Sequence, residues 1–431
     1  MTELIRDRAL RSLPTARIRH GRLARPRWWR SVLAIVAAGL SVVLVSGTAL
    51  ASIVTWRFAS NIQEDVLVDA DGNVREIPTV GDWPGGFNIM ISAVDNAEGQ
   101  FDAGQRDATL NDANLLVHVA EDQQSAVVIS IPRDLIVPIP ACPREDGEGS
   151  YSAMSAQPFN VAYGYGGMNC VVLTAEELTG LTIDYSASIS LEGVAAMSTA
   201  VGGVDICITE PLYDRYTGLD LPNAGVNTIE GFQAMQFLRT RYAVGDGGDF
   251  SRIGSQQQYM ASLIRKLQDD GTLTNPAALY GLAQVATENM RLSSGLTSLD
   301  TMVSMARVLA EIPRENIVFV QYPATTNGAG KAVPLEDEAD LIFAKILAGE
   351  RFTLADDPTG NGTEIVPDPN AEPTPEPEPT PSSEAGGETP APSDDPAAPS
   401  DPSASPAPTE PEELDFARGQ TAADNTCSVV R

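Results

Sequence analysis

Short runs of β-branched and apolar residues alternate along the chain with longer amphipathic stretches. One such run, 125–131, reads Ser-Ala-Val-Val-Ile-Ser-Ile, which is typical of a central strand buried on both faces. Pro132 follows, and because proline cannot donate to a ladder, we expect pairing to end there. Arg133 and Asp134 then lie at the end of a strand, where open α/β sheets bind their ligands. A surface ion pair is the alternative that this stretch leaves open.

The same reading of hydrophobic periods predicts the other elements of the fold. Strands are expected over 87–94, 114–120, 204–208 and 316–322. Helices are expected over 174–181, 189–201, 231–241, 276–289, 299–311 and 335–347. The first of these helices would start at Thr174, because Glu177 three residues later completes a capping box. This alternation predicts an α/β fold: a single α-β-α layered domain with a central mixed sheet, over 87–353.

Three arginines lie around a Gly-rich loop at 243–250. The helix over 231–241 ends in Arg239-Thr240-Arg241. We expect it to unwind near Phe237, because the side chains of Arg239 and Arg241 share a face only on an extended segment. Arg252 then begins a second amphipathic helix, whose N-terminus favours anions through its free N–H groups. A set of surface arginines paired with acids is the alternative.

The N-terminal 56 residues predict a membrane anchor. The first 30 residues hold nine Arg and two acids, and 31–56 carry no charge. An apolar helix of this length spans a bilayer, and the Arg-rich side stays in the cytoplasm. We therefore expect a cytoplasmic arm at 1–30, a transmembrane helix at 31–56 and an extracytoplasmic stalk at 57–86. A signal peptide cleaved near Ala51 is the alternative, and it also places the rest of the chain outside the cytoplasm.

The C-terminal part divides into a biased and an ordinary segment. Residues 357–411 contain sixteen Pro and no Lys or Arg, a composition that cannot bury a core. We expect 354–415 to be a disordered spacer. The short segment 416–431 is less biased and contains Cys427, so it could dock on the domain.

Charge and cysteine content restrict the partners and the compartment. After residue 56 the chain keeps 19 of its 28 basic and 56 of its 58 acidic side chains, which argues against nucleic acid as a partner. The four cysteines show no Cys-x-x-Cys spacing, and in an oxidising compartment disulfides are expected. Three connectivities are possible. We favour Cys142 with Cys170 and Cys207 with Cys427, which would tie the C-terminal segment to the core.

The available side chains exclude several kinds of catalysis. Only two histidines exist, His20 on the cytoplasmic arm and His118 in an apolar strand, and no nucleophile elbow accompanies them. Phosphate loops of the Walker type and dinucleotide fingerprints are missing from the sequence. Carboxylates and arginines remain, which together suit a divalent ion on a phosphate or pyrophosphate. Asp95 and Asp112 flank the loop between the first two strands, although such residues are more often turn formers.

Six motifs in order resemble the LytR-CpsA-Psr family over roughly residues 87–322. They are Ser-Ile-Pro-Arg-Asp at 130–134, Phe-Asn-Val-Ala-Tyr-Gly-Tyr-Gly-Gly at 159–167, Leu-Thr-Gly-Leu-Thr-Ile-Asp-Tyr at 178–185, Val-Gly-Gly-Val-Asp at 201–205, Arg-Thr-Arg at 239–241 and Gly-Asp-Phe-Ser-Arg-Ile with Gln-Gln at 248–257. The resemblance implies an extracytoplasmic, single-pass membrane phosphotransferase. It would move a glycopolymer from a polyprenyl-pyrophosphate carrier onto peptidoglycan, with Mg²⁺ on the pyrophosphate and the polyprenyl chain in an apolar pocket between sheet and helices.

The resemblance also implies roles for individual residues. Asp95 and Asp112 are similar to the acids of the metal site, and Asp95 is the candidate base. The clamp that binds the pyrophosphate resembles Arg133, Arg239, Arg241 and Arg252, with Gln256 assisting. The first three of these arginines also resemble catalytic residues.

The chain also departs from the family pattern. Asn96, Asn111 and Ser255 stand where relatives often have other residues, and at least two positive charges are missing, one of which Arg106 could replace. Two alternatives to the transferase therefore stay open. One is a non-catalytic protein that binds lipid-linked glycopolymer in a regulatory role, and the other is a pyrophosphatase acting on the same lipid.

Overall fold

The computed structural model describes residues 28–29, 32–42, 45–46, 63–76, 86–95, 109–355, 359–360, 362–367 and 411–431. The chain divides into two compact units, Met1–Ser60 and Asn61–Arg431. Residues 32–42 of the first unit are helical. Among the described residues, no helix combines the length and the apolar character needed to cross a bilayer. Much of the predicted span 31–56, most of the arm 1–30 and part of the stalk 57–86 lie outside the described residues.

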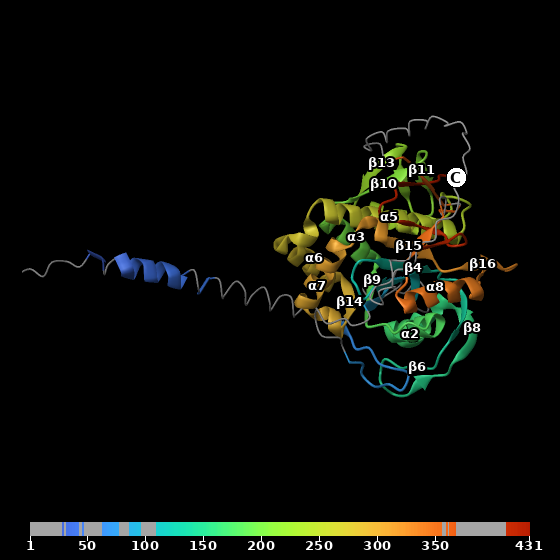
Figure 1. Cartoon of the computed structure of the whole chain (residues 1–431), viewed down its shortest axis with the longest axis horizontal. Coiled ribbons are helices and arrows are strands. Elements are labelled where there is room, and N and C mark those ends of the chain that lie inside the picture. Colours follow the sequence, from blue (N-terminus) through green and yellow to red (C-terminus); the bar gives the residue numbers. More distant parts are fainter. Residues whose placement is uncertain are drawn as a thin grey trace, which may run out of the picture. The chain divides into compact units, whose positions relative to one another are not determined.

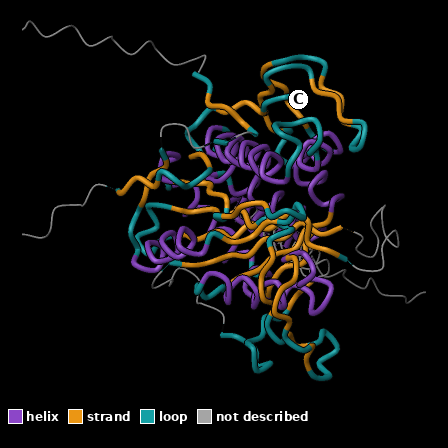
Figure 2. The backbone as a smooth tube through the Cα atoms, turned by 90° about the vertical axis from the view of Figure 1, so that its right-hand side faces the viewer, coloured by secondary structure: helices purple, strands orange, loops and turns teal. Residues whose placement is uncertain are grey.

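A mixed eight-stranded sheet forms the centre of the second unit (Figures 1 and 2). In spatial order its strands are β1 (Gln63–Asp65), β14 (Met290–Ser293), β9 (Tyr185–Ser190), β2 (Phe87–Asp95), β3 (Leu110–Val119), β4 (Ala126–Ile131), β15 (Ile317–Gln321) and β21 (Gly419–Thr421). β4 pairs antiparallel with β3 and parallel with β15. As the sequence predicts, β4 is an inner strand that ends directly before Pro132.

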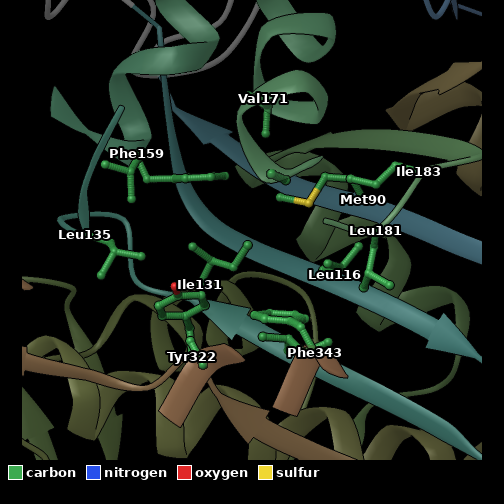
Figure 3. Packing of buried hydrophobic residues seen from close by; sticks show 14 of the residues in the cluster. Met90, Leu116, Ile131, Leu135, Phe159, Val171, Leu181, Ile183, Tyr322 and Phe343 are labelled. Atoms are coloured by element: carbon green, nitrogen blue, oxygen red, sulfur yellow. The ribbon is translucent and has the colours of Figure 1, made fainter. Parts of the chain in front are cut away.

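Helices cover both faces of this sheet, which confirms the predicted α/β fold with a mixed sheet. α2 (Ala162–Thr179) and α8 (Glu336–Ala348) share one hydrophobic cluster with the sheet, and α5 (Asp249–Asp269) and α7 (Leu299–Glu311) share the other. Successive side chains of β4 alternate between the two clusters: Ile129 and Ile131 belong to the first, and Val128 belongs to the second. Figure 3 shows Ile131 between Leu135, Phe159 and Tyr322. Burial of each such aliphatic side chain contributes roughly 1.5–3 kcal/mol.

A second sheet of four strands contains residues that the sequence assigns to the disordered spacer. Its order is β13 (Gly225–Ile229), β10 (Val204–Ile208), β22 (Thr426–Ser428) and β19 (Thr363–Ile365). β19 and also β20 (Glu412–Leu414) lie within the predicted spacer 354–415, so this boundary is wrong at both ends. Composition misses these strands because their partners, β22 and β18 (Phe352–Leu354), are remote in sequence. Residues 368–410 lie outside the described part.

Two of the helix predictions need correction. α2 begins at Ala162 rather than Thr174, because Gly166 and Gly167 kink the helix without ending it. Thr174 is buried inside this helix, where its hydroxyl donates to the carbonyl oxygen of Cys170 and caps nothing. α4 (Phe232–Arg239) continues past Phe237, so the predicted unwinding does not occur there. The predicted helices 276–289 and 299–311 agree with α6 (Pro276–Asn289) and α7.

Both expected disulfides are present. Cys142 bonds to Cys170 across 28 residues and Cys207 bonds to Cys427 across 220 residues. The second bond joins the neighbouring strands β10 and β22, so the segment 411–431 is part of the domain.

Candidate functional site

Arg133 and Asp112 form an ion pair at the carboxyl end of β4. The register pairs Ile131 of β4 with Asn114 of β3, so the residues beyond this pair face each other across the two strands. The Arg133 Nη1 donates to Asp112 Oδ1 at 2.8 Å. The Arg133 side chain is 21% exposed and the Asp112 side chain is 19% exposed. The pair is therefore largely buried, which excludes the alternative of a surface ion pair.

A β-bulge places several oxygen atoms next to this pair. The pairing of β2 with β3 shifts register between Ala93 and Val94, which leaves Asp112 without an opposite residue. Asp95 is 2% exposed, and its Oδ1 accepts from the Leu110 N–H at 3.2 Å. The Oδ1 atom of Asn111 is buried and accepts no hydrogen bond within the described structure. Asp95, Asn111 and Asp112 thus all lie within two residues of the register shift or of its partner positions.

The first turn of α5 supplies the other half of the cluster. The Asp249 Oδ1 lies 2.7 Å from Arg252 Nη2 and 3.7 Å from Arg133 Nε. The Arg252 Nη2 also donates to the main-chain oxygen of Asp112 at 3.3 Å. The sequence analysis did not select Asp249, although its spacing of three residues from Arg252 at a helix start could have indicated it.

Several polar atoms of this cluster have no hydrogen-bond partner in the described structure. They are Nε of Arg133, Nε of Arg252 and Oδ2 of Asp249, and all are buried, whereas Asp249 Oδ1 is in the ion pair with Arg252. A buried polar group left in this state costs about 1–3 kcal/mol. Such groups are uncommon in folded proteins, and they indicate a site that a ligand completes.

Burial and neighbouring charges shift the pKa values of Arg252 and Arg133 in opposite directions. Burial lowers the pKa of Arg252, and the positive charges of Arg133 and Arg241 lower it further, against the effects of Asp249 and Asp112. Burial acts in the same direction on Arg133, but there the carboxylates of Asp112 and Asp249 prevail and raise the pKa of Arg133. A guanidinium group stays protonated in proteins, so both arginines keep their positive charge.

Arg241 and Arg239 differ in their relation to this cluster. Arg241 acts electrostatically on Arg252, and its Nε donates to the carbonyl oxygen of Gly247 at 3.1 Å. Arg239 is exposed at the end of α4, where its Nη1 lies 3.9 Å from Met235 Sδ. Thr240 between them is completely buried. The structure thus brings Arg133 and Arg252 together at Asp249, and the participation of Arg241 and Arg239 stays a prediction.

Gln256 and Ser255 serve contacts within the protein. The Gln256 Nε2 donates to the carbonyl oxygen of Leu238 at 2.9 Å, which joins α5 to the end of α4. Ser255 is fully buried, and its hydroxyl lies 2.9 Å from the hydroxyl of Ser428. Ser255 therefore packs α5 against β22. Arg106 lies outside the described residues.

The residues at the bulge fit a magnesium ion in kind. Within the described ranges there is no group of three His, Cys, Asp or Glu side chains that could hold a metal. Mg²⁺ needs only one or two carboxylates when substrate phosphates and waters supply the remaining oxygens. Asp95, Asp112 and the unpaired oxygen of Asn111 are hard oxygen donors of this kind. The ion itself stays a prediction.

Comparison with known proteins settles the family. Residues 59–343 match the LytR_cpsA_psr family model. The chain belongs to the LytR_cpsA_psr family. It is 30% identical over 243 residues to the cell wall biosynthesis protein LcpA of Corynebacterium glutamicum, a match that covers 53% of this chain and 46% of LcpA. The chain thus spans about half the length of that relative.

Two further similarities concern a named transferase and the fold. Over 262 residues the chain is 26% identical to the polyisoprenyl-teichoic acid–peptidoglycan teichoic acid transferase TagU of Oceanobacillus iheyensis, covering 60% of this chain and 74% of TagU. A solved Streptococcus agalactiae structure aligns with a TM-score of 0.50 at 19% identity, covering 62% of this chain and 88% of the other. At that identity the structural likeness concerns the fold alone.

The apolar pocket for a polyprenyl chain stays a prediction. Between the sheet and α2, side chains such as Met90, Leu116 and Phe159 pack against each other (Figure 3).

Proposed function

We propose that this protein is a phosphotransferase that attaches a polyprenyl-pyrophosphate-linked glycopolymer to peptidoglycan. It would act outside the cytoplasm from a single-pass membrane anchor at 31–56. Membership of the family and the teichoic acid transferase named among its relatives support this class of reaction.

The observation that carries the proposal is the buried cluster of Arg133, Arg252 and Asp249. Two guanidinium groups with unused Nε donors lie on either side of one carboxylate. A diphosphate has enough negative charge and enough acceptor oxygens to satisfy both guanidinium groups. The rest of the exported chain is strongly acidic, so a diphosphate depends on these two arginines for binding, in competition with Asp112 and Asp249.

The reaction transfers one phosphoryl group between two oxygens. A sugar hydroxyl of the peptidoglycan attacks the phosphorus next to the glycopolymer and forms a new P–O bond. The bond from this phosphorus to the bridging oxygen breaks, and the electron pair leaves with the polyprenyl phosphate. Asp95 accepts the hydroxyl proton. Arg133, Arg241 and Arg252 stabilise the charge that develops on the leaving phosphate.

A magnesium ion held by Asp95 and Asp112 would neutralise charge on the pyrophosphate oxygens. Asp112 is engaged by Arg133 in the ligand-free protein. A pyrophosphate that binds Arg133 would release this carboxylate.

Incubation of the full-length chain with a polyprenyl-pyrophosphoryl oligosaccharide, Mg²⁺ and peptidoglycan oligomers tests the proposal. We expect an oligosaccharide–phosphate–peptidoglycan product and free polyprenyl phosphate. Release of phosphorylated oligosaccharide without coupling would indicate the pyrophosphatase instead. Tight binding without turnover would indicate the non-catalytic regulatory protein, for which the missing family arginines are the argument.

A further inference from the structure

Residues 426–431 run beside the loop that joins α4 to α5. β22 lies between β10 and β19, and Cys427 bonds to Cys207 of β10. Figure 1 places the C-terminus beside β10 and β11. β22 thus brings residues 429–431 next to the loop 242–248. This loop separates Arg241 from Asp249.

Three hydrogen bonds connect this segment to the loop. The Gly245 N–H donates to the Val429 oxygen at 2.8 Å, and the Arg431 N–H donates to the Ala243 oxygen at 3.0 Å. The Arg431 Nη1 donates to the main-chain oxygen of Asp246 at 2.7 Å. The loop and the segment therefore pair along their main chains, as two short strands would.

The segment is also fixed to the helix below the loop. The hydroxyl of Ser428 lies 2.9 Å from that of Ser255 and donates to Gln258 Oε1 at 2.6 Å. Ser428, Ser255 and Gln258 are all fully buried. β22 therefore lies on α5 one to two turns after Arg252.

Both ends of loop 242–248 are connected by hydrogen bonds to residues in or next to the candidate site. Arg241 donates to the Gly247 oxygen at 3.1 Å, as noted above. At the other end, Asp246 Oδ1 accepts from the Gly248 N–H and from the Ser251 hydroxyl, each at 2.7 Å. Asp249 and Arg252 begin α5 at this point. The conformation of the loop thus sets the positions of charged groups on both sides of the cluster.

The loop has little conformational preference of its own. Gly245, Gly247 and Gly248 make up three of its seven residues, and fixing the backbone of one residue costs about 1–2 kcal/mol. Gly247 has a φ of +81°, and a Cβ there would come within 2.4 Å of Arg431 Nη1. Glycine at this position therefore allows both the turn and the close approach of Arg431.

We infer that residues 426–431, locked by the Cys207–Cys427 disulfide, are a positioning element of the transfer site. They hold loop 242–248 in the conformation that presents Arg241 to a diphosphate bound at Arg133 and Arg252. Arg431 is a positioning residue that acts through Asp246 and Gly247. This inference rests on the proposed function for its effect on catalysis, whereas its effect on the loop is independent of that function.

The first test compares Arg431→Ala with Arg418→Ala in the full-length protein. Arg418 is an exposed arginine that lies outside residues 426–431 and outside loop 242–248. We expect Arg431→Ala to speed hydrogen–deuterium exchange in 242–248 at least tenfold and to weaken binding of inorganic pyrophosphate with Mg²⁺ about tenfold. Arg418→Ala should change neither quantity.

The second test removes the covalent lock. Cys207→Ala/Cys427→Ala should increase exchange in 242–248 more than Arg431→Ala does, and Cys142→Ala/Cys170→Ala should not affect this loop. In the transfer assay Arg431→Ala and Cys207→Ala/Cys427→Ala should lower kcat more than they raise the KM for peptidoglycan, because a displaced Arg241 weakens charge stabilisation.

The outcomes separate this inference from the proposed function. Unchanged loop exchange and pyrophosphate affinity in both Arg431→Ala and the 207/427 double variant would overturn the inference. If the wild-type protein transfers nothing but these variants still loosen the loop and weaken pyrophosphate binding, the proposed function fails and the positioning role stands.

Discussion

Asp249 and Arg252 lie one helical turn apart at the start of α5, with Asp249 Oδ1 2.7 Å from Arg252 Nη2. Arg133 approaches the same carboxylate from the end of β4. One acid thus separates two arginines whose charges repel each other. Because Asp249 is at a helix N-terminus, the helix dipole also favours its negative charge.

Asp249→Asn should therefore destabilise the protein strongly. The neutral amide no longer compensates Arg252, and breaking a buried ion pair costs roughly 3–5 kcal/mol. Arg252 keeps its contact with the Asp112 main chain, so we expect about 2–3 kcal/mol in urea unfolding. Asp270→Asn is the matched control, because Asp270 pairs with Lys266 on the exposed part of α5 and should lose less than about 0.5 kcal/mol. Equal effects of the two substitutions would show that the buried cluster contributes nothing to stability.

Arg241→Ala should abolish measurable transfer. Arg241 is electrostatically coupled to Arg252, and removal of one group that stabilises developing charge costs about 10²–10³ in kcat. Arg239→Ala should also lower activity, but by less, because Arg239 lies exposed at the end of α4. Steady-state rates with a lipid-linked oligosaccharide measure both. Full activity of both variants would remove these two arginines from the clamp.

Binding of Mg²⁺ should depend on pyrophosphate. In the ligand-free protein Asp112 accepts from Arg133 at 2.8 Å, so the metal has to compete with a guanidinium group. Pyrophosphate that binds Arg133 frees the carboxylate and adds its own oxygens. Calorimetry should show weak binding of Mg²⁺ alone and at least tenfold tighter binding with pyrophosphate, and Asp112→Asn should lose this enhancement. Chelation with EDTA should stop transfer. Tight stoichiometric binding of Mg²⁺ without pyrophosphate would contradict this linkage.

The sequence predicts the sheet well where hydrophobic pattern and burial coincide. The apolar run before Pro132 corresponds to β4, which contributes to both hydrophobic clusters. Thr174 shows the limit of such reasoning, since a capping-box pattern also occurs inside a helix when a preceding pair of glycines only kinks it. The extent of α2 is decided by its packing on the sheet, which no local pattern records.

The candidate site is predictable in part for the same reason. Arg133, Asp112 and Arg252 come from motifs at strand or helix ends, and the structure brings them together. Asp249 is harder to predict, because its spacing from Arg252 is a weak signal and only the fold brings Arg133, 116 residues earlier, to the same carboxylate. The cysteines predict that the C-terminal segment is tied to the core, but its contact with α5 through Ser428 and Ser255 is not predictable from the sequence.

His118 should make stability depend on pH. Burial lowers its pKa from 6.5 to about 4, and its Nδ1 lies 2.8 Å from Asn88 Oδ1. Between these values the unfolded chain binds a proton that the folded protein does not, so stability falls as pH decreases from about 6.5 toward 4. From pH 7 to pH 5 the loss should be about 2 kcal/mol. In urea unfolding, His118→Gln should lack this part of the pH dependence, and identical slopes for both proteins would contradict a buried neutral histidine.

Removal of the Cys142–Cys170 disulfide should destabilise the domain without disturbing the candidate site. The bond closes a loop of 28 residues and joins β6 (Cys142–Pro143) to α2. Loop-closure entropy for this length predicts a loss of roughly 3.5 kcal/mol in Cys142→Ala/Cys170→Ala, measured by urea unfolding. Both sulfur atoms belong to the hydrophobic cluster on the α2 side of the sheet, whereas α5 packs on the other side. Pyrophosphate affinity should therefore stay within twofold of the wild type, and a larger change would mean that α2 and the candidate site are coupled through the sheet.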